Sequence, residues 1–357
     1  MKTIKIGDRE IGDLKPVYVI AEAGVNHNGD IGLAKRLIEA ARDSGADAVK
    51  FQTFTVDEIA ADHAPQARYQ IANTGVAESQ ASMLSKLALS HTAFQQLKKH
   101  ADGSGVEFLS TPFSIPDADF LHSLDLAAYK IGSGDLTNLP FLEHVAGFEK
   151  PILLSTGMAT LTEVGEALQT LERSSMHDVV LLQCTSEYPT PLSHVNLRVI
   201  ETFRSEFDVP IGFSDHTEGT AASVYAASLG ACIIEKHFTL SRALPGPDHK
   251  ASIEPHELKE MITRVRATKL HSLEIPEAAL GSAEKKPTAE EVETAKIVRK
   301  SIFARRDIRK GALIGLDDVK IVRPEMGLLP KELKKILGMR AAQHIAADTP
   351  LSWGMLE

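Results

Sequence analysis

Short apolar runs recur along the first two thirds of the chain, and polar side chains follow each of them. Between the runs, apolar residues recur at helical spacing, as Leu33, Leu37 and Ala41 do after the capping residue Asp30. Eight strand-like runs that alternate with helices predict an α/β protein with a (β/α)8 barrel. The runs are 17–21, 48–52, 107–110, 127–131, 151–154, 179–184, 210–213 and 232–234.

The seventh and eighth runs end in similar polar triplets, SDH at 214–216 and EKH at 235–237. Parallel strands joined by a helix place their carboxyl ends side by side. Residues two apart on a strand share a face, so Glu235 groups with His237. The pattern allows His216 and His237 to converge on one divalent metal ion. The alternative is two unrelated loop histidines, each capping a helix or a turn.

The ends of the chain differ from the barrel pattern. Residues 1–13 predict a hairpin that covers one end of the barrel domain, which we assign to 1–280. Residues 281–297 are charged and rich in alanine without a hydrophobic period, so we interpret them as a linker. Residues 298–357 alternate short apolar runs with turns and predict a small β-rich domain. Its core is small, so we expect it to be braced against a barrel.

Composition limits the classes of function. The 357 residues are 43% hydrophobic and 24% charged, which is typical of a globular protein with a large core. A net charge of −9 argues against nucleic acid or anionic membrane as partner, so an anionic substrate needs a local cluster of cations. Cys184 and Cys232 lie inside predicted strands as core thiols. With no apolar signal region and no run of membrane-spanning length, we expect a cytoplasmic protein.

Two lysines, Lys50 and Lys130, lie within apolar strand runs. A buried ammonium group requires an anionic partner, because leaving it unpaired is costly. That partner is either a carboxylate on a neighbouring strand or a bound anion. Two such lysines, together with Ser and Thr hydroxyls and the glycine-rich turns after the fourth and fifth runs, favour a cradle for phosphate and carboxylate. Glu22, which ends the first run, is a candidate base, metal ligand or water-orienting group, or else a turn cap.

Motifs along the whole chain resemble the sialic acid synthase family, in the family's order. They are EAGVNHNG at 22–29, AVKFQTF at 48–54, ARYQIANTG at 67–75, STPF at 110–113, YKIGSGDL at 129–136, STGMAT at 155–160, CTSEYPTP at 184–191, FSDH at 213–216, IEKHFTL at 234–240 and GPDHKASIEP at 246–255. The segment KSIFARRDIRKGALI resembles the family's antifreeze-like, or SAF, domain.

The resemblance implies an enzyme that condenses phosphoenolpyruvate with an open-chain N-acyl mannosamine-type sugar and releases phosphate. It implies that His216 and His237 carry a divalent metal, Mn²⁺ or Mg²⁺, and that Glu22 acts near the aldehyde. The positions that match the phosphoenolpyruvate site are Lys50, Thr111, Lys130, Ser133, Ser155, Ser186 and Ser214. Those that match the sugar site are Gln52, Asn73, Tyr188, Asp248 and Arg323. Members are usually homodimers in which the small domain, with its arginine, lies over the partner's barrel.

The acceptor sugar is less constrained. Many members carry RPGNG where this chain has RPEMG at 323–327. The first glycine of RPGNG is a position that tolerates positive φ, and this chain lacks it. The difference affects how far Arg323 reaches towards the sugar. GVNHNG, NTG and GPDHKAS resemble the neuraminate and legionaminate branches, whereas RPEMGLLP resembles the pseudaminate version. We expect an N-acetylneuraminate synthase that uses N-acetylmannosamine. The first alternative is N,N'-diacetyllegionaminate synthase, which uses 2,4-diacetamido-2,4,6-trideoxymannose, and the second is pseudaminate synthase.

Two other classes fit less well. A metal-dependent barrel hydrolase typically carries HxH on its first strand, and the first run here ends in Glu22. A non-catalytic sugar- or ice-binding protein leaves the strand lysines and the strand-end histidines without a role.

Overall fold

Eight parallel strands form the centre of the larger domain in the computed structural model, which describes residues 3–357. The strands are β3 (Tyr18–Gly24), β4 (Ala48–Thr53), β5 (Glu107–Pro112), β6 (Tyr129–Ile131), β7 (Ile152–Ser155), β8 (Val179–Cys184), β9 (Ile211–Asp215) and β10 (Ile233–His237). Their order is β5-β4-β3-β10-β9-β8-β7-β6, and β5 and β6 pack beside each other, so the sheet closes on itself. The predicted (β/α)8 barrel is therefore confirmed.

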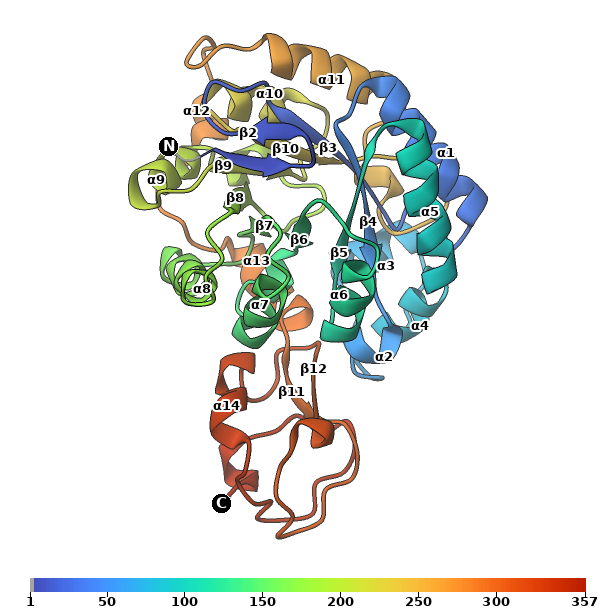
Figure 1. Cartoon of the computed structure of the whole chain (residues 1–357), viewed down its shortest axis with the longest axis vertical. Coiled ribbons are helices and arrows are strands. Elements are labelled where there is room, and N and C mark those ends of the chain that lie inside the picture. Colours follow the sequence, from blue (N-terminus) through green and yellow to red (C-terminus); the bar gives the residue numbers. More distant parts are fainter. Residues whose placement is uncertain (1–2) are drawn as a thin grey trace.

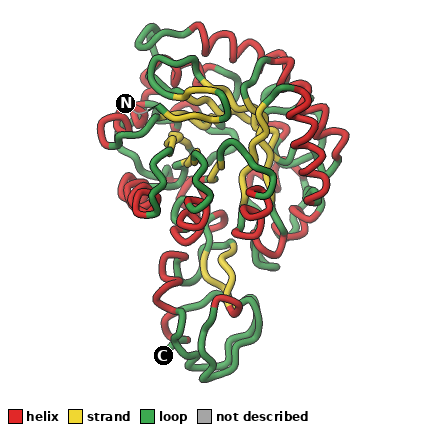
Figure 2. The backbone as a smooth tube through the Cα atoms, in the orientation of Figure 1, coloured by secondary structure: helices red, strands yellow, loops and turns green. Residues whose placement is uncertain are grey.

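Helices surround this sheet (Figures 1 and 2). They are α1 (Ile31–Ser44), α5 (His91–Ser104), α6 (Ile115–His122), α7 (Leu139–Ala146), α8 (Leu161–Arg173), α9 (Arg198–Glu206), α10 (Ala221–Ser228) and α11 (Pro255–Ala267). Local chemistry sets the ends of α1: the Asp30 side chain accepts a hydrogen bond from the amide of Leu33, and Gly45 ends the helix at a φ of 87°. The main core lies between the helices and the outer face of the sheet.

A second core fills the amino-terminal end of the barrel. The hairpin of β1 (Ile4–Ile6) and β2 (Arg9–Ile11) places Ile4, Ile6 and Ile11 against inward side chains of the barrel strands. The expected hairpin therefore covers this end, although residues 1 and 2 of the expected segment lie outside the described residues. With one end closed, the opposite, carboxyl end is left for the site.

Three short helices, α2 (Val56–Ile59), α3 (Arg68–Thr74) and α4 (Gln80–Ser85), interrupt the connection between β4 and β5. The helices α12 (Glu277–Leu280) and α13 (Ala289–Val298) follow α11. The segment expected as a linker thus contains most of a helix. A capping box at Thr288 and Glu291 starts α13, and this local signal outweighs the missing hydrophobic period.

The small domain has its own core, built around the antiparallel pair β11 (Ser301–Ala304) and β12 (Val319–Val322), with the short helix α14 (Leu333–Ile336). It lies below the barrel in Figure 1. A buried ion pair at 2.8 Å joins Lys300 to Asp135 in the turn after β6. This domain therefore docks on the barrel of its own chain. Between residues 3 and 357, no helix has both the length and the apolar character to span a bilayer.

Candidate active site

The carboxyl ends of the barrel strands surround one pocket. Every residue predicted for the site lines it except Asn73. The lining members of that set are Glu22, Lys50, Gln52, Thr111, Lys130, Ser133, Ser155, Ser186, Tyr188, Ser214, His216, His237, Asp248 and Arg323. These residues come from every part of the chain, and strand register brings them together: Glu22 pairs with His237 on β10 and with Lys50 on β4.

The two histidines lie side by side in this pocket. The ring centroids of His216 and His237 are 5.4 Å apart, and both side chains are buried. Nδ1 of His216 donates to the Thr185 carbonyl at 2.7 Å, because a carbonyl can only accept, so Nε2 is the ring nitrogen left for a metal ion. Burial, with His216 and Lys50 as neighbouring cations, lowers the pKa of His237 well below its usual value, so the ring is neutral.

This donor set fits a divalent metal ion. Nδ1 of His237 is buried without a hydrogen-bond partner among the described residues, and a neutral imidazole in that state is suited to be a ligand. The pKa of His216 is raised: burial opposes the charged ring, but the Cys184 sulfur, 3.8 Å from Nδ1, and the Thr185 carbonyl favour it. A metal ion at Nε2 would take the place of that second proton.

An ion pair on the outer face of the sheet supports the histidine-bearing strands. Lys236 and Asp215 face each other in register on β10 and β9, with Nζ and Oδ2 3.1 Å apart and both side chains fully buried. Asp215 also accepts from the amide and hydroxyl of Thr217, the residue after His216. Because side chains alternate along a strand, this outward pair holds the two inward histidines at adjacent positions.

A buried network of charges occupies the base of the pocket. Nζ of Lys50 lies 2.6 Å from Oε2 of Glu22 and 3.8 Å from Oε2 of Glu235. Nζ of Lys130 lies 3.3 Å from Oε1 of Glu235. The hydroxyl of Ser214 donates to Glu235 at 3.0 Å. Each lysine therefore has a carboxylate partner, which is the first of the two alternatives weighed from sequence. Both lysines also line the pocket, and a bound anion there stays a prediction.

Glu235 is the functional candidate that sequence reasoning missed. It shares its strand face with His237, and that alternation was the available signal. Burial raises the pKa of Glu235, but Lys130 and Lys50 outweigh burial and lower it to about 2. Burial lowers the pKa of Lys130 in spite of Glu235. At 3.3 Å the ion pair between Lys130 and Glu235 is formed, and its net stabilisation is small because burying both charges is costly.

Hydroxyl groups surround the lysines. The Ser155 hydroxyl is buried and has no partner among the described residues, while the Ser133 hydroxyl accepts from the Gly157 amide at 2.9 Å. A Cβ atom on Gly157 would lie 2.2 Å from the Ser186 hydroxyl oxygen, so only glycine allows these two loops to approach so closely. The arrangement offers hydrogen-bond donors and two ammonium groups to an anion.

The outer part of the pocket is aromatic. Tyr188 lies against His216, with centroids 4.2 Å apart, and stacks on Tyr69 at 4.9 Å. Burial and the charge of Glu22 raise the pKa of Asp248 to about 7, while His216 opposes the shift. Asn73 does not line the pocket, because its side-chain amide donates to the Pro247 carbonyl at 2.6 Å. Its position thus supports the loop that carries Asp248.

Arg323 enters the pocket of its own chain. Its Nη1 donates to the Gln80 side chain at 3.3 Å, and its guanidinium lies 5.2 Å from the centre of the Phe113 ring. Backbone hydrogen bonds to Ile59 and Ala61 hold the same residue. Glu325, which replaces the family's glycine, has no positive φ, so the loop reaches the pocket without a glycine there.

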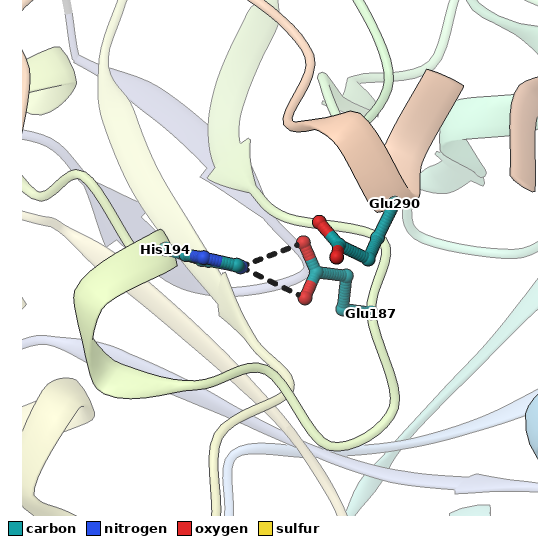
Figure 3. A group of neighbouring side chains, drawn as sticks. All are labelled: Glu187, His194 and Glu290. Atoms are coloured by element: carbon teal, nitrogen blue, oxygen red, sulfur yellow. Dashed lines mark hydrogen bonds and ion pairs between the residues drawn. The ribbon is translucent and has the colours of Figure 1, made fainter. Parts of the chain in front are cut away.

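A separate cluster lies beside the loop after β8. Among residues 3–357, one group of three possible metal ligands lies close together, namely Glu187, His194 and Glu290 (Figure 3). Nδ1 of His194 is 3.0 and 3.1 Å from the Glu187 oxygens, and the Thr288 hydroxyl donates to Glu187 at 2.5 Å. These residues do not line the pocket, and the hydrogen bond from Thr288 to Glu187 joins the β8 loop to the start of α13.

Enzymes with this fold carry their chemistry at the carboxyl ends of the strands, so the fold and the pocket define a (β/α)8-barrel enzyme. Residues 37–274 match the NeuB family, and residues 299–357 match the SAF domain. The chain is 43% identical over 360 residues to N,N'-diacetyllegionaminic acid synthase of Legionella pneumophila, covering 98% of this chain and 99% of that protein. The chain belongs to the NeuB family, whose members are sialic acid synthase-type enzymes.

Other relatives show the range of the family. The enzyme of the same name from Campylobacter jejuni is 43% identical, covering 94% of this chain and 98% of that protein. N-acetylneuraminate-9-phosphate synthase of Homo sapiens is 33% identical, covering 95% of this chain and 92% of that protein. The crystal structure of the spore coat polysaccharide biosynthesis protein SpsE from Bacillus subtilis has a TM-score of 0.86 at 33% identity, covering 100% of this chain and 99% of that chain.

Proposed function

We propose that this chain condenses phosphoenolpyruvate with 2,4-diacetamido-2,4,6-trideoxymannose, giving N,N'-diacetyllegionaminate and phosphate. Two relatives at 43% identity bear the name of that synthase, whereas the human N-acetylneuraminate-9-phosphate synthase is 33% identical. The comparisons thus favour the legionaminate alternative over the N-acetylneuraminate synthase that we expected from sequence.

The outer wall of the pocket supports this choice of acceptor. Near Arg323 the lining is largely apolar, with contributions from Val25, Ile59, Met83, Leu84, Leu87 and Phe113. A 6-deoxy sugar with two acetamido groups presents methyl groups to such a wall, whereas N-acetylmannosamine presents a hydroxymethyl group that would lose its hydration there. Gln80 and Arg323 supply polar partners for an acetamido carbonyl.

The observation that carries the reaction class is the pairing of two ammonium groups with two imidazoles in one pocket. Lys50 and Lys130, with the surrounding hydroxyls, are suited to hold the phosphate and carboxylate of phosphoenolpyruvate. We infer that His216 and His237 hold a divalent metal ion, Mn²⁺ or Mg²⁺. When bound, such an ion acts as a Lewis acid and polarises a carbonyl oxygen of the substrate.

In the proposed reaction, the π electrons of the phosphoenolpyruvate C=C bond form a C–C bond with the aldehyde carbon of the open-chain sugar, and the C=O π electrons move to the aldehyde oxygen, which takes up a proton. Water adds to the cationic carbon two and loses a proton. The tetrahedral hemiketal phosphate then loses its hydroxyl proton as the C–O bond to phosphate breaks, which leaves the 2-keto acid and phosphate. Glu22, held by Gln52 at 3.2 Å and Lys50 at 2.6 Å, is placed to orient that water and accept its proton. The lysines keep the anion in register throughout.

We also propose a cytoplasmic location and a homodimer that exchanges its small domains. Arg323 already lies in the pocket of its own chain, so exchange is not required to deliver this residue. Sedimentation at several protein concentrations would test the dimer.

The proposed function is tested by measuring phosphate release from phosphoenolpyruvate with each candidate sugar, with added Mn²⁺ and with chelator. We expect the largest kcat/KM with 2,4-diacetamido-2,4,6-trideoxymannose and no turnover after chelation. A larger value with N-acetylmannosamine would restore the neuraminate assignment. If none of the candidate sugars supports phosphate release, the proposed reaction class is refuted.

A further inference from the structure

Helix α13, which connects the two domains, forms part of the pocket wall. Thr294 and Val298 line the pocket. A Cβ atom on Gly134, in the turn after β6, would lie 2.9 Å from both Val298 Cγ1 and the Val298 carbonyl oxygen. The helix therefore packs directly on a loop of the anion-binding end, and only glycine permits that distance.

Glu291, in the first turn of α13, is a buried carboxylate with an exposed fraction of 2%. Its Oε1 accepts from the backbone amides of Met158 and Ser186, at 2.7 and 2.8 Å. Its Oε2 accepts from the amide of Thr288 at 3.0 Å and completes the capping box. One oxygen therefore starts the helix, and the other joins two loops that are far apart in sequence.

Those loops follow β7, whose last residue is Ser155, and β8, whose loop carries Ser186. Met158 adopts a φ of 61°, a conformation that is strained for a residue with a side chain. Its amide donates to Glu291, and its carbonyl accepts from Arg299 at 2.7 Å, at the end of the same helix. Both polar backbone groups of the strained residue are thus held by α13.

We propose that Glu291 is a positioning residue for the phosphoenolpyruvate end of the pocket, and this inference rests on the proposed function. By binding two loop amides with one oxygen, it sets the spacing of the Ser155 and Ser186 hydroxyls around the anion. Glu291 does not line the pocket, so it acts through the loops and not on the substrate. Binding of the anion therefore depends on a residue outside the eight βα units.

The test compares Glu291→Ala and Glu291→Gln with Glu290→Gln as matched control. Glutamine keeps one acceptor oxygen for the loop amides and alanine keeps none. Glu290 is the exposed neighbour in the same turn, and the Met158 and Ser186 amides donate to Glu291 and not to Glu290. Calorimetry with phosphoenolpyruvate alone gives the Kd for each purified full-length variant, and thermal unfolding gives Tm. Steady-state kinetics then gives KM for each substrate and kcat.

We expect Glu291→Ala to raise the Kd for phosphoenolpyruvate at least about tenfold, since a misplacement near 1 Å has effects of that order. The Kd of Glu291→Gln for phosphoenolpyruvate should lie between those of Glu291→Ala and wild type. In both Glu291 variants, the KM for the sugar at saturating phosphoenolpyruvate should stay within about twofold of wild type. Glu290→Gln should bind as wild type does. If alanine prevents folding, the glutamine variant still decides, because it preserves shape and one acceptor.

Unchanged phosphoenolpyruvate binding in folded Glu291→Ala, or in Glu291→Gln where alanine prevents folding, would overturn the inference and leave the proposed function intact. An equal loss of affinity for both substrates, in proportion to the decrease in Tm, would also overturn the inference, because a general structural role predicts that outcome. Wild-type protein that binds no phosphoenolpyruvate would overturn the proposed function, and this inference with it.

Discussion

Replacing Glu235 with glutamine tests the charge network at the base of the pocket. The change preserves the shape of the side chain and a carbonyl acceptor for the Ser214 hydroxyl, but it removes the carboxylate 3.3 Å from Lys130. Lys50 is less affected, because Glu22 remains 2.6 Å away. The substitution therefore leaves one ammonium group, that of Lys130, buried without its anionic partner.

The expected cost follows from that geometry. Breaking a buried ion pair by removing one partner costs about 3–5 kcal/mol. Both side chains are nearly inaccessible here, at 4% and 6% exposure, so solvent screens the pair little. The retained acceptor and the lowered pKa of Lys130 ease the loss of its charge, so we expect the lower end, about 3 kcal/mol. This is a large part of the free energy of unfolding of a typical domain, about 5–15 kcal/mol.

Urea unfolding of the full chain at pH 7, followed by circular dichroism, measures the difference. Glu284→Gln is the control: Glu284 pairs with Lys286 at 2.6 Å but both are exposed, so its loss should cost less than about 0.5 kcal/mol. In the double variant Glu235→Gln/Lys130→Met no unpaired ammonium remains, and we expect recovery of at least about 1 kcal/mol. A cost below about 1 kcal/mol for Glu235→Gln, with no recovery in the double variant, would refute the paired network.

Three further predictions concern other residues. His237→Ala should abolish turnover but leave the circular dichroism spectrum unchanged, and a rate near that of wild type would exclude His237 as a metal ligand. Arg323→Ala should raise the KM for the sugar at least about tenfold with little change in the Kd for phosphoenolpyruvate, because Arg323 lies at the apolar wall; equal losses would contradict its role. Burial lowers the pKa of His27 to about 4, so the unfolded chain binds more protons between pH 4 and 6.5. The stability that neutral His27 contributes is therefore present above pH 6.5 and is lost as the pH falls towards 4. Between pH 7 and 5 the loss is about 2 kcal/mol in the free energy of unfolding. Urea unfolding of His27→Gln should show a pH dependence that is smaller by this amount.

The barrel and most of the pocket could be predicted from sequence because the signals are local. An apolar run reports a buried strand, and in a parallel barrel the residue after each run lies on the same rim as all the others. That rule predicted that His216 and His237 lie on one rim. Lys50 and Lys130 lie inside runs, and the cost of burying an unpaired ammonium group was the reason to expect them at an anionic partner. All four line one pocket. The hairpin at the amino terminus was predictable for the same reason, since a turn between two short alternating runs is also a local pattern.

Tertiary structure decided which of these groups pair and what supports them. Glu235 is a shared counter-ion because the register of β10 against its neighbours sets its distance to two lysines, and register is not visible in one strand. Glu291 meets amides 105 and 133 positions away, and Asn73 turns from the pocket to a loop carbonyl. Arg323 lies in the pocket of its own chain because of how the two domains dock. Such contacts depend on distances between segments that only the packed chain brings together, whereas the strand ends follow from the periodicity of the sequence.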